Sequence, residues 1–185
     1  MTIELKDICN ISFGPYLQPS QGGTIPYLQI RQFNDEGQIL YNATDFVSTD
    51  ERTNGYLLMD GDVLFVGKGS RLFAWCYSAG VGPAIASSIF YVLRTDRAKI
   101  DPQYLAVILN LQQSKSTFNQ MSAGTSIFSI RKSELGAFKV PLLPIKEQLA
   151  IANLSKLHQQ EMKLTNQLIS QKQNLYTGII SKLIK

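Results

Sequence analysis

The chain has 185 residues, of which 44% are hydrophobic, 10% aromatic and 17% charged, and its formal net charge is +4. This composition supports one hydrophobic core and excludes wholesale disorder, while the two cysteines, Cys9 and Cys76, are too few for a disulfide scaffold. No apolar run reaches the ~18 residues of a membrane helix, and the first residues lack the apolar stretch of a secretory signal. We therefore expect a soluble, cytoplasmic protein of one or at most two domains.

The charges are distributed unevenly along the chain. Residues 1–62 contain nine acidic and three basic side chains, residues 63–144 contain three acidic and nine basic ones, and residues 145–185 contain six lysines and two glutamates. A basic surface attracts polyanions because binding releases their counterions. The basic middle of the chain therefore indicates a polyanionic partner, although charges that are simply solvated also explain the pattern.

The composition changes abruptly at residue 144. All seven prolines, twelve of the thirteen glycines and seventeen of the eighteen aromatic residues lie before or at this position. Pro141 and Pro144 mark the boundary, because proline and the residue before it disfavour a helix interior. We predict an α+β fold, with a mixed, β-rich globular domain over residues 1–144 and one long helix over residues 145–185.

Apolar runs bounded by turn residues predict the strands of the first domain, and we expect them at Thr24–Ile30, Val63–Val66, Leu72–Tyr77, Ile85–Leu93 and Ala137–Leu142. Pro26 indicates an edge position for the first of these strands. Residues 60–62 are expected to form a turn, and residues 67–70 and 122–126 to form loops. Asp101 and Pro102 predict the N-cap and first residue of a helix that extends to about residue 120.

The tail predicts a single helix of about 40 residues, which would span ~60 Å at 1.5 Å per residue. Its apolar stripe follows a heptad repeat and consists of Leu154, Leu157, Leu164, Leu168 and Leu175, with Ile179 beside it. A lone helix of this length cannot bury its stripe against itself, so we expect it to pair with another helix, in the same chain or a second one. Glu161 and Gln171 interrupt the stripe and are candidates to set the register. The alternative is a helix folded back on its own domain.

Two segments come close to catalytic motifs, and neither is complete. Gly61 and Gly67-Lys68 resemble a phosphate-binding loop, but five residues separate the glycines instead of four, and Gly69 follows the lysine where Ser or Thr is required. Residues 101–104, Asp-Pro-Gln-Tyr, differ at one position from the Asp-Pro-Pro-Tyr motif of amino-group methyltransferases, and no glycine-rich cofactor loop follows an early strand. A standalone enzyme is therefore the least favoured class.

The remaining reactive side chains are few. His158 is the only histidine and the two cysteines are far apart in sequence, so no zinc site is expected. Cys76 lies in a predicted strand and is expected to be a small core residue instead of a nucleophile. We expect no catalytic residue, no metal and no cofactor.

Four segments match one family in order and spacing. Residues 23–31 are similar to a G-x-I-P-Y-I-x-I strand, residues 58–70 to an L-x-x-G-D-V-L segment that ends in Gly-Ser, residues 124–130 to a G-x-x-Q-x-x-I stretch, and residues 140–151 to a V-P-L-P-P-x-x-E-Q-x-x-I helix start. The chain thereby resembles the DNA specificity (S) subunits of type I restriction–modification systems over nearly its whole length. It departs from the family at Ile127, where glutamine is frequent, and at Leu143, which replaces a proline.

The resemblance implies a non-catalytic subunit whose recognition domain reads one half of a bipartite site on double-stranded DNA. The long helices of the family separate two such domains and dock methyltransferase subunits, and a restriction subunit is a further candidate partner. S subunits usually hold two recognition domains and two helices, whereas this chain has one of each. It is either a natural half-subunit or one half of a longer protein.

For a half-subunit, the simplest assembly is a homodimer whose helices pack as an antiparallel coiled coil. Its two-fold symmetry would require inverted half-sites, separated by fewer than ~18 base pairs at ~3.4 Å each.

Polar and basic side chains on loops are expected to contact the DNA, and the candidates are Arg31, Gln32, Lys68, Ser70, Arg71, Thr125, Ser126 and Arg131. The glycines at 67 and 69 would let the backbone approach a phosphate. The helix residues expected to face a partner are Leu154, Leu157, Leu164, Leu168, Leu175 and Ile179. The alternative function is a protein-interaction module, or a degenerate specificity-subunit remnant without DNA activity.

Overall fold

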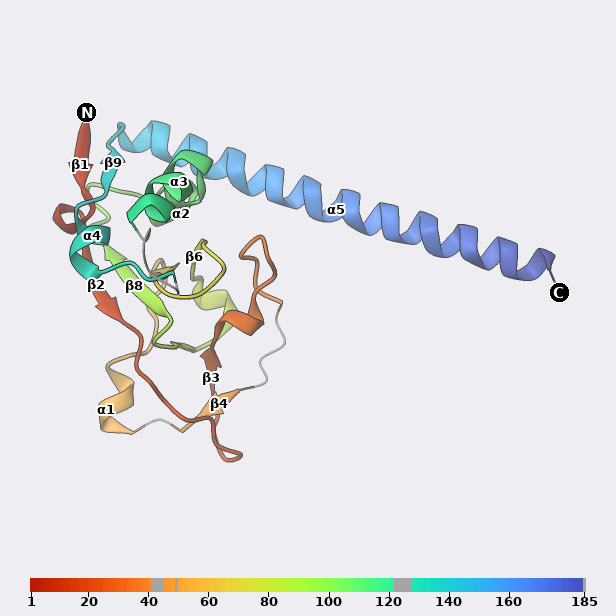
Figure 1. Ribbon diagram of the computed structural model, residues 1–185, viewed down its shortest axis with the longest axis horizontal. Helices are drawn as coiled ribbons and strands as arrows, with labels where there is room; N and C mark the ends of the chain where they lie inside the picture. Colours follow the sequence, from red (N-terminus) through yellow and green to blue (C-terminus); the bar gives the residue numbers. More distant parts are fainter. Residues whose placement is uncertain (41–44, 49, 122–127, 185) are drawn as a thin grey trace.

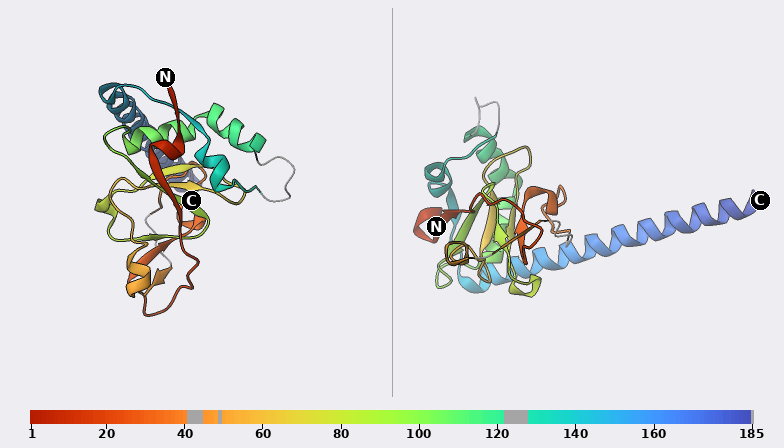
Figure 2. Two further views of the ribbon diagram at one scale, coloured as in Figure 1. Left: turned by 90° about the vertical axis from the view of Figure 1, so that its left-hand side faces the viewer. Right: turned by 90° about the horizontal axis from the view of Figure 1, so that it is seen from below.

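The computed structural model describes residues 1–40, 45–48, 50–121 and 128–184. A β-rich domain carries one long helix, α5 (Ile145–Leu183), which projects far beyond it (Figures 1 and 2). The strands are β1 (Thr2–Glu4), β2 (Cys9–Phe13), β3 (Ile25–Leu28), β4 (Phe46–Val47), β5 (Val63–Val66), β6 (Ala74–Cys76), β7 (Ile85–Ala86), β8 (Phe90–Thr95) and β9 (Lys139–Pro141). The shorter helices are α1 (Glu51–Asn54), α2 (Pro102–Asn110), α3 (Gln112–Met121) and α4 (Lys132–Gly136), with 3-10 turns η1 (Leu5–Asp7), η2 (Ile30–Gln32) and η3 (Ala79–Val81). The expected combination of a mixed β-rich domain and a long helix is confirmed.

A four-stranded antiparallel sheet in the order β2-β8-β5-β6 forms the centre of the domain. All four residues of β5 are buried, as expected of this apolar run. Successive side chains of a strand point to opposite faces. Val63 and Phe65 accordingly join the core cluster that contains Tyr104 of α2, while Leu64 and Val66 join a second cluster with Phe90.

The strand β3 is central in a three-stranded sheet of order β4-β3-β7, so the edge position expected from Pro26 is wrong. Pro26 pairs with β4, whereas β7 pairs only with Tyr27 and Leu28. The missing proline N–H is not needed, because Thr24 and Tyr27 donate the backbone bonds to β4 and the residue before it. The proline is tolerated in this central strand because the two neighbouring strands, β4 and β7, pair with different residues of β3.

Two predicted elements are each divided in the structure. The run expected as one strand over Ile85–Leu93 forms β7 and β8 in different sheets, joined by a turn in which Phe90 N–H donates to Ser87 O (3.0 Å). The helix expected to continue to about residue 120 breaks at Leu111, whose φ of −59° and ψ of 144° are not helical. The break separates α2 from α3. The predicted N-cap is confirmed, since Asp101 accepts a bond from Tyr104 N–H.

The N-terminal strand β1 pairs with β9 and thereby lies beside the start of α5 (Figure 1). The Glu4 carboxylate contacts Lys139 Nζ at 2.7 Å and Lys6 Nζ at 2.6 Å. Hydrogen bonds from Lys139 and then Lys6 lower the pKa of Glu4 to about 2. Charge pairs at the surface thus join residues that are 135 positions apart in sequence.

The helix α5 begins at the expected residue, and its first turns pack against α2. Gln148 and Ala152 are buried there, whereas every described residue after Ser155 is exposed. Figure 2 shows the helix continuing away from the domain, so the alternative of a helix folded back on its own domain is excluded. None of the described helices has the length and apolarity needed to cross a membrane.

Candidate nucleic-acid interface

The glycine loop, defined here as Gly67–Ser70, lies beside residues 128–130. Lys68 and Ser129 form an isolated antiparallel bridge. The backbone N–H of Gly69 donates to Phe128 O (3.0 Å), and Ile130 N–H donates to Gly67 O (3.0 Å). Two segments that are about 60 residues apart in sequence therefore form one edge of the domain. Lys68 and Ser70 are exposed on it, and so is Arg131, which directly follows Ile130.

Each of the two glycines in this loop has an identifiable steric role. A Cβ at Gly67 would come within 2.5 Å of the Tyr91 ring, so only glycine fits beneath this side chain. The Tyr91 hydroxyl in turn donates to Ile130 O at 2.7 Å and fixes the neighbouring segment. Gly69 has a φ of +114°, which L side chains rarely adopt. The glycines therefore shape the loop, whatever the loop contacts.

Arg71 joins the glycine loop to a third segment, residues 30–35. Its guanidinium donates to Phe33 O at 2.8 Å and to Ile30 O, and it lies 3.4 Å from Asp35 Oδ1. These bonds satisfy most of its donors. Arg71 therefore holds the η2 segment against the glycine loop, and the DNA contact expected of it stays a prediction.

Arg31 and Gln32 meet at one buried carboxylate, that of Asp45. Arg31 Nε donates to Asp45 Oδ2 at 2.8 Å, and a second guanidinium nitrogen contacts Oδ1. Hydrogen bonding to Asp45 raises the pKa of Arg31. Gln32 is only 3% exposed; its Nε2 donates to Asp45 Oδ2 and its Oε1 accepts from Gln29 N–H. Gln32 therefore supports the loop, whereas the Arg31 side chain is 58% exposed.

Much of the basic charge of residues 63–144 is neutralised by acidic side chains of the first 62 residues. The arginines at 71, 94 and 97 pair with carboxylates at 35, 62 and 60, and Lys139 pairs with Glu4. Among the described residues of the basic region, no ion pair is formed by Lys68, Lys115, Arg131 or Lys132. Three of these four side chains lie close together: Lys68 is in the glycine loop, and Arg131 and Lys132 directly follow the neighbouring segment 128–130. Thr125 and Ser126, the other two candidates, lie outside the described residues.

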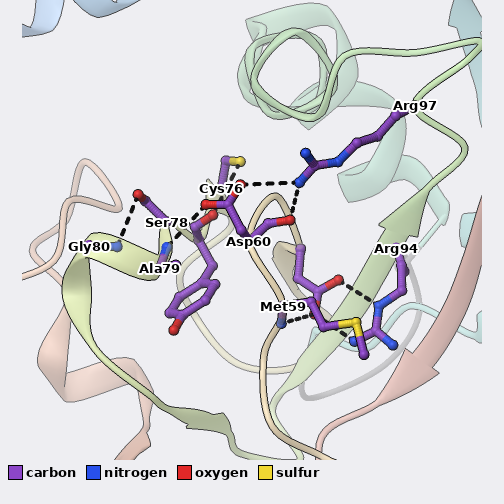
Figure 3. Close-up of polar contacts among 10 residues, drawn as sticks. Met59, Asp60, Cys76, Ser78, Ala79, Gly80, Arg94 and Arg97 are labelled. Atoms are coloured by element: carbon purple, nitrogen blue, oxygen red, sulfur yellow. Dashed lines mark hydrogen bonds and ion pairs between the residues drawn. The ribbon is translucent and has the colours of Figure 1, made fainter.

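The segment that resembles L-x-x-G-D-V-L has a structural role in this domain (Figure 3). Gly61 has a φ of +85° and makes the turn. The Asp62 side chain is 1% exposed and binds Arg94 through two hydrogen bonds, of 2.9 and 2.8 Å, and also accepts from Met59 N–H. The Asp60 carboxylate accepts a hydrogen bond from Ala79 N–H. This bond, followed by the contact with Arg97, lowers the pKa of Asp60. Sequence reasoning identified the turn but missed the buried ion pair.

The described residues include a buried thiol beside a cavity. A cavity of about 360 Å³ lies between this turn and the base of α5, and its lining includes Asp60, Cys76 and Arg97. Cys76 is buried, as expected, and burial raises the pKa of its thiol to about 12, so the reactive thiolate is absent at neutral pH. No group of metal-binding side chains occurs in the part of the chain that the structure describes.

The projecting part of α5 carries two apolar stripes. The first contains all six residues expected to face a partner, and each is about half exposed or more: Leu154, Leu157, Leu164, Leu168, Leu175 and Ile179. The second stripe was missed and consists of Met162, Ile169, Tyr176 and Leu183, which are also exposed. Its signal in the sequence is a strict seven-residue spacing. Two adjacent stripes make the apolar face wider than the seam of a two-stranded coiled coil.

Comparison with solved structures gives the same fold in S subunits. The S subunit of a type I restriction–modification system from M. genitalium has 15% sequence identity to this chain, with a TM-score of 0.61. The match covers 88% of this chain and 40% of the M. genitalium chain. The HsdS subunit from Thermoanaerobacter tengcongensis is 19% identical with a TM-score of 0.62, covering 87% and 37%. A chain from a study of complex assembly and conformational transition of the type I R-M system is 21% identical with a TM-score of 0.61, covering 89% and 39%.

This chain therefore spans about two fifths of the length of these structures. The family model described as the type I restriction modification DNA specificity domain matches residues 1–172. Because the match covers the whole domain and most of α5, the chain belongs to the type I restriction–modification DNA specificity domain family.

Proposed function

We propose that this chain is a non-catalytic DNA specificity unit, which reads one half of a bipartite DNA site for a methyltransferase complex. The observation that carries the proposal is the joining of three segments, residues 30–33, 67–71 and 128–131, into one surface through Arg71 and the Lys68–Ser129 bridge. Free cations on this surface would bind phosphates, and exposed polar groups such as Ser70 would face base edges. Family membership supports the same role.

The helix α5 supplies the second half of the proposal. Its first stripe pairs with a second copy of the helix in an antiparallel coiled coil, which makes the chain a homodimer. The second stripe then stays available to helices of methyltransferase subunits, and a restriction subunit would join through them. The exposure of both stripes beyond the domain supports this division.

Charge removal on the loop surface tests the DNA-reading role. We expect the triple variant Lys68→Gln, Arg131→Gln, Lys132→Gln to weaken binding of the methyltransferase complex to its DNA and to reduce the slope of log K against log salt by up to ~3. A matched control removes three exposed lysines of α5, at positions 146, 156 and 163. Equal DNA binding by the triple variant and the wild type would favour the protein-interaction alternative.

A further inference from the structure

The order of the residues along the first stripe of α5 limits how two copies of the helix can pair. In heptad positions a and d, it reads Leu154, Leu157, Glu161, Leu164, Leu168, Gln171, Leu175 and Gly178. The domain covers none of these side chains, because the contacts of α5 with the domain end near Ser155. Whatever helix covers the stripe must therefore match two polar positions and one glycine among five leucines.

A parallel pair of α5 helices fits this order poorly. With the two copies in step, Glu161 would face Glu161 of the partner subunit inside an apolar seam, where like charges repel. Both recognition domains would also emerge from the same end of the pair and crowd one another. An antiparallel pair avoids both problems, because it places the domains at opposite ends.

Resting on the homodimer proposed above, we infer that two copies of α5 pair in one antiparallel register, centred at residue 166. In this register Leu164 faces the partner's Leu168, and Leu157 faces the partner's Leu175. Glu161 faces the partner's Gln171, so the carboxylate can accept a hydrogen bond from the amide. Leu154 faces the partner's Gly178, which leaves room for the larger side chain.

Sliding one helix along the other by one heptad, in either direction, breaks this matching. Such a slide moves the centre of the pair by half a heptad. Moving the centre back by half a heptad places Leu154 against the partner's Gln171 and Glu161 against the partner's Leu164. Moving it forward places Leu168 against the partner's Gln171 and Glu161 against the partner's Gly178. Two-fold symmetry repeats every mismatch, so each shift leaves several polar groups without a partner in the seam. The order of the stripe therefore selects one register by excluding its neighbours.

This register has a consequence for the assembly. The two Ile145 residues would lie about 63 Å apart along the pair, because 21 residues separate each of them from the centre at 1.5 Å per residue. The second stripe is left uncovered along the middle of the pair. At ~3.4 Å per base pair this separation corresponds to about 18 base pairs, which is the upper limit on the DNA gap.

Cysteine cross-linking tests the register in the full-length chain. In the variant Leu157→Cys, Leu175→Cys, we expect mild oxidation to give a covalent dimer. The control variant Leu157→Cys, Leu168→Cys should stay uncross-linked, since its cysteines meet only in the register shifted back. Cys9 and Cys76 are buried, and burial raises the pKa of both thiols to about 12, so they do not compete. All substituted side chains are exposed, so the domain should fold normally.

A charge substitution gives a second, independent readout. Gln171→Lys would place a lysine opposite the partner's Glu161 twice in the dimer, and we expect the dimer to tighten about fivefold in sedimentation. A dimer that cross-links through Leu157→Cys and Leu168→Cys, or that weakens with Gln171→Lys, overturns the register but not the homodimer. A monomeric wild type overturns the pairing itself, and the DNA-reading role would still be decided by the methylated sequence.

Discussion

The side-chain oxygen of Gln148, at the base of α5, accepts a hydrogen bond from the backbone N–H of Asp101 at 2.8 Å. The same amide donates to Lys99 O at 3.0 Å and to Leu143 O at 2.8 Å, and the residue is fully buried. One side chain therefore joins the start of α2, the loop before it and the segment preceding α5. This joint fixes the direction in which the long helix leaves the domain, as the proposed spacing of two DNA-reading domains would require.

Replacement of Gln148 by leucine should destabilise the domain. Three backbone groups would lose their partner in a buried site, and we expect the free energy of unfolding to fall by about 3 kcal/mol. Urea denaturation measures this change. Gln160→Leu, on the exposed part of α5, is the matched control and should change stability by less than about 0.5 kcal/mol. Equal stability of the two variants would show that the joint is not needed for folding.

Asp62 and Asp60 are neighbouring carboxylates with different expected contributions to stability. Asp62→Ala leaves the Met59 N–H and Arg94 without their buried partner, and we expect a loss of about 3 kcal/mol. Asp60 is 60% exposed on its side chain, so Asp60→Ala should cost about 1 kcal/mol or less. Thermal unfolding of both variants gives the comparison, and the reverse order would contradict the arrangement in Figure 3.

The ion pairs of Glu4 predict a dependence of stability on pH. The pKa of Glu4 is lowered from 4.5 to about 2, so its contribution is present above pH 4.5 and is lost as the pH falls toward 2. Wild type should therefore be more stable than Glu4→Gln at pH 6, and the two should converge by about pH 2. Glu36→Gln removes an equal charge that forms no ion pair among the described residues, and it serves as the control for the change in net charge. Thermal unfolding between pH 2 and 7 tests this.

Arg71 and Lys68 are adjacent cations that we expect to behave differently. Arg71→Gln removes the bonds to Ile30 O and Phe33 O, and should lower the free energy of unfolding by about 2 kcal/mol. Lys68→Gln should leave stability unchanged and reduce the salt dependence of DNA binding by about one unit of slope. Denaturation and DNA titration of the same two variants decide whether the structural assignment of Arg71 is correct.

Local signals in the sequence account for the elements that were predicted correctly. The buried strand β5, the N-cap at Asp101 and the start of α5 each depend on a few neighbouring residues. The strand β1 was missed, because it is three residues long and exists through pairing with β9 more than 130 positions later. The division between β7 and β8 was missed because the run from 85 to 93 is apolar except for Ser87 and Ser88, and the turn that begins at Ser87 was not recognised.

The roles of the candidate site residues also depend on contacts that are distant in sequence. A polar residue in a loop gives no sign in the sequence of whether its partner is solvent, DNA or a distant backbone group. Gln32 and Arg71 were therefore grouped with Lys68, although Asp45 and the carbonyls of residues 30 and 33 engage them. Only the tertiary contacts separate the residues that build the loops from those that the loops expose.

The most direct test of the DNA-specificity role is co-expression of the chain with an adenine methyltransferase subunit of a type I system, followed by base-resolved sequencing of methylation in the host DNA. The proposed homodimer predicts methylation at an interrupted, palindromic motif whose gap is shorter than ~18 base pairs. An asymmetric bipartite motif would mean that a different second domain completes the site. A stable complex that leaves the DNA unmethylated, or methylates it without sequence preference, would contradict the account.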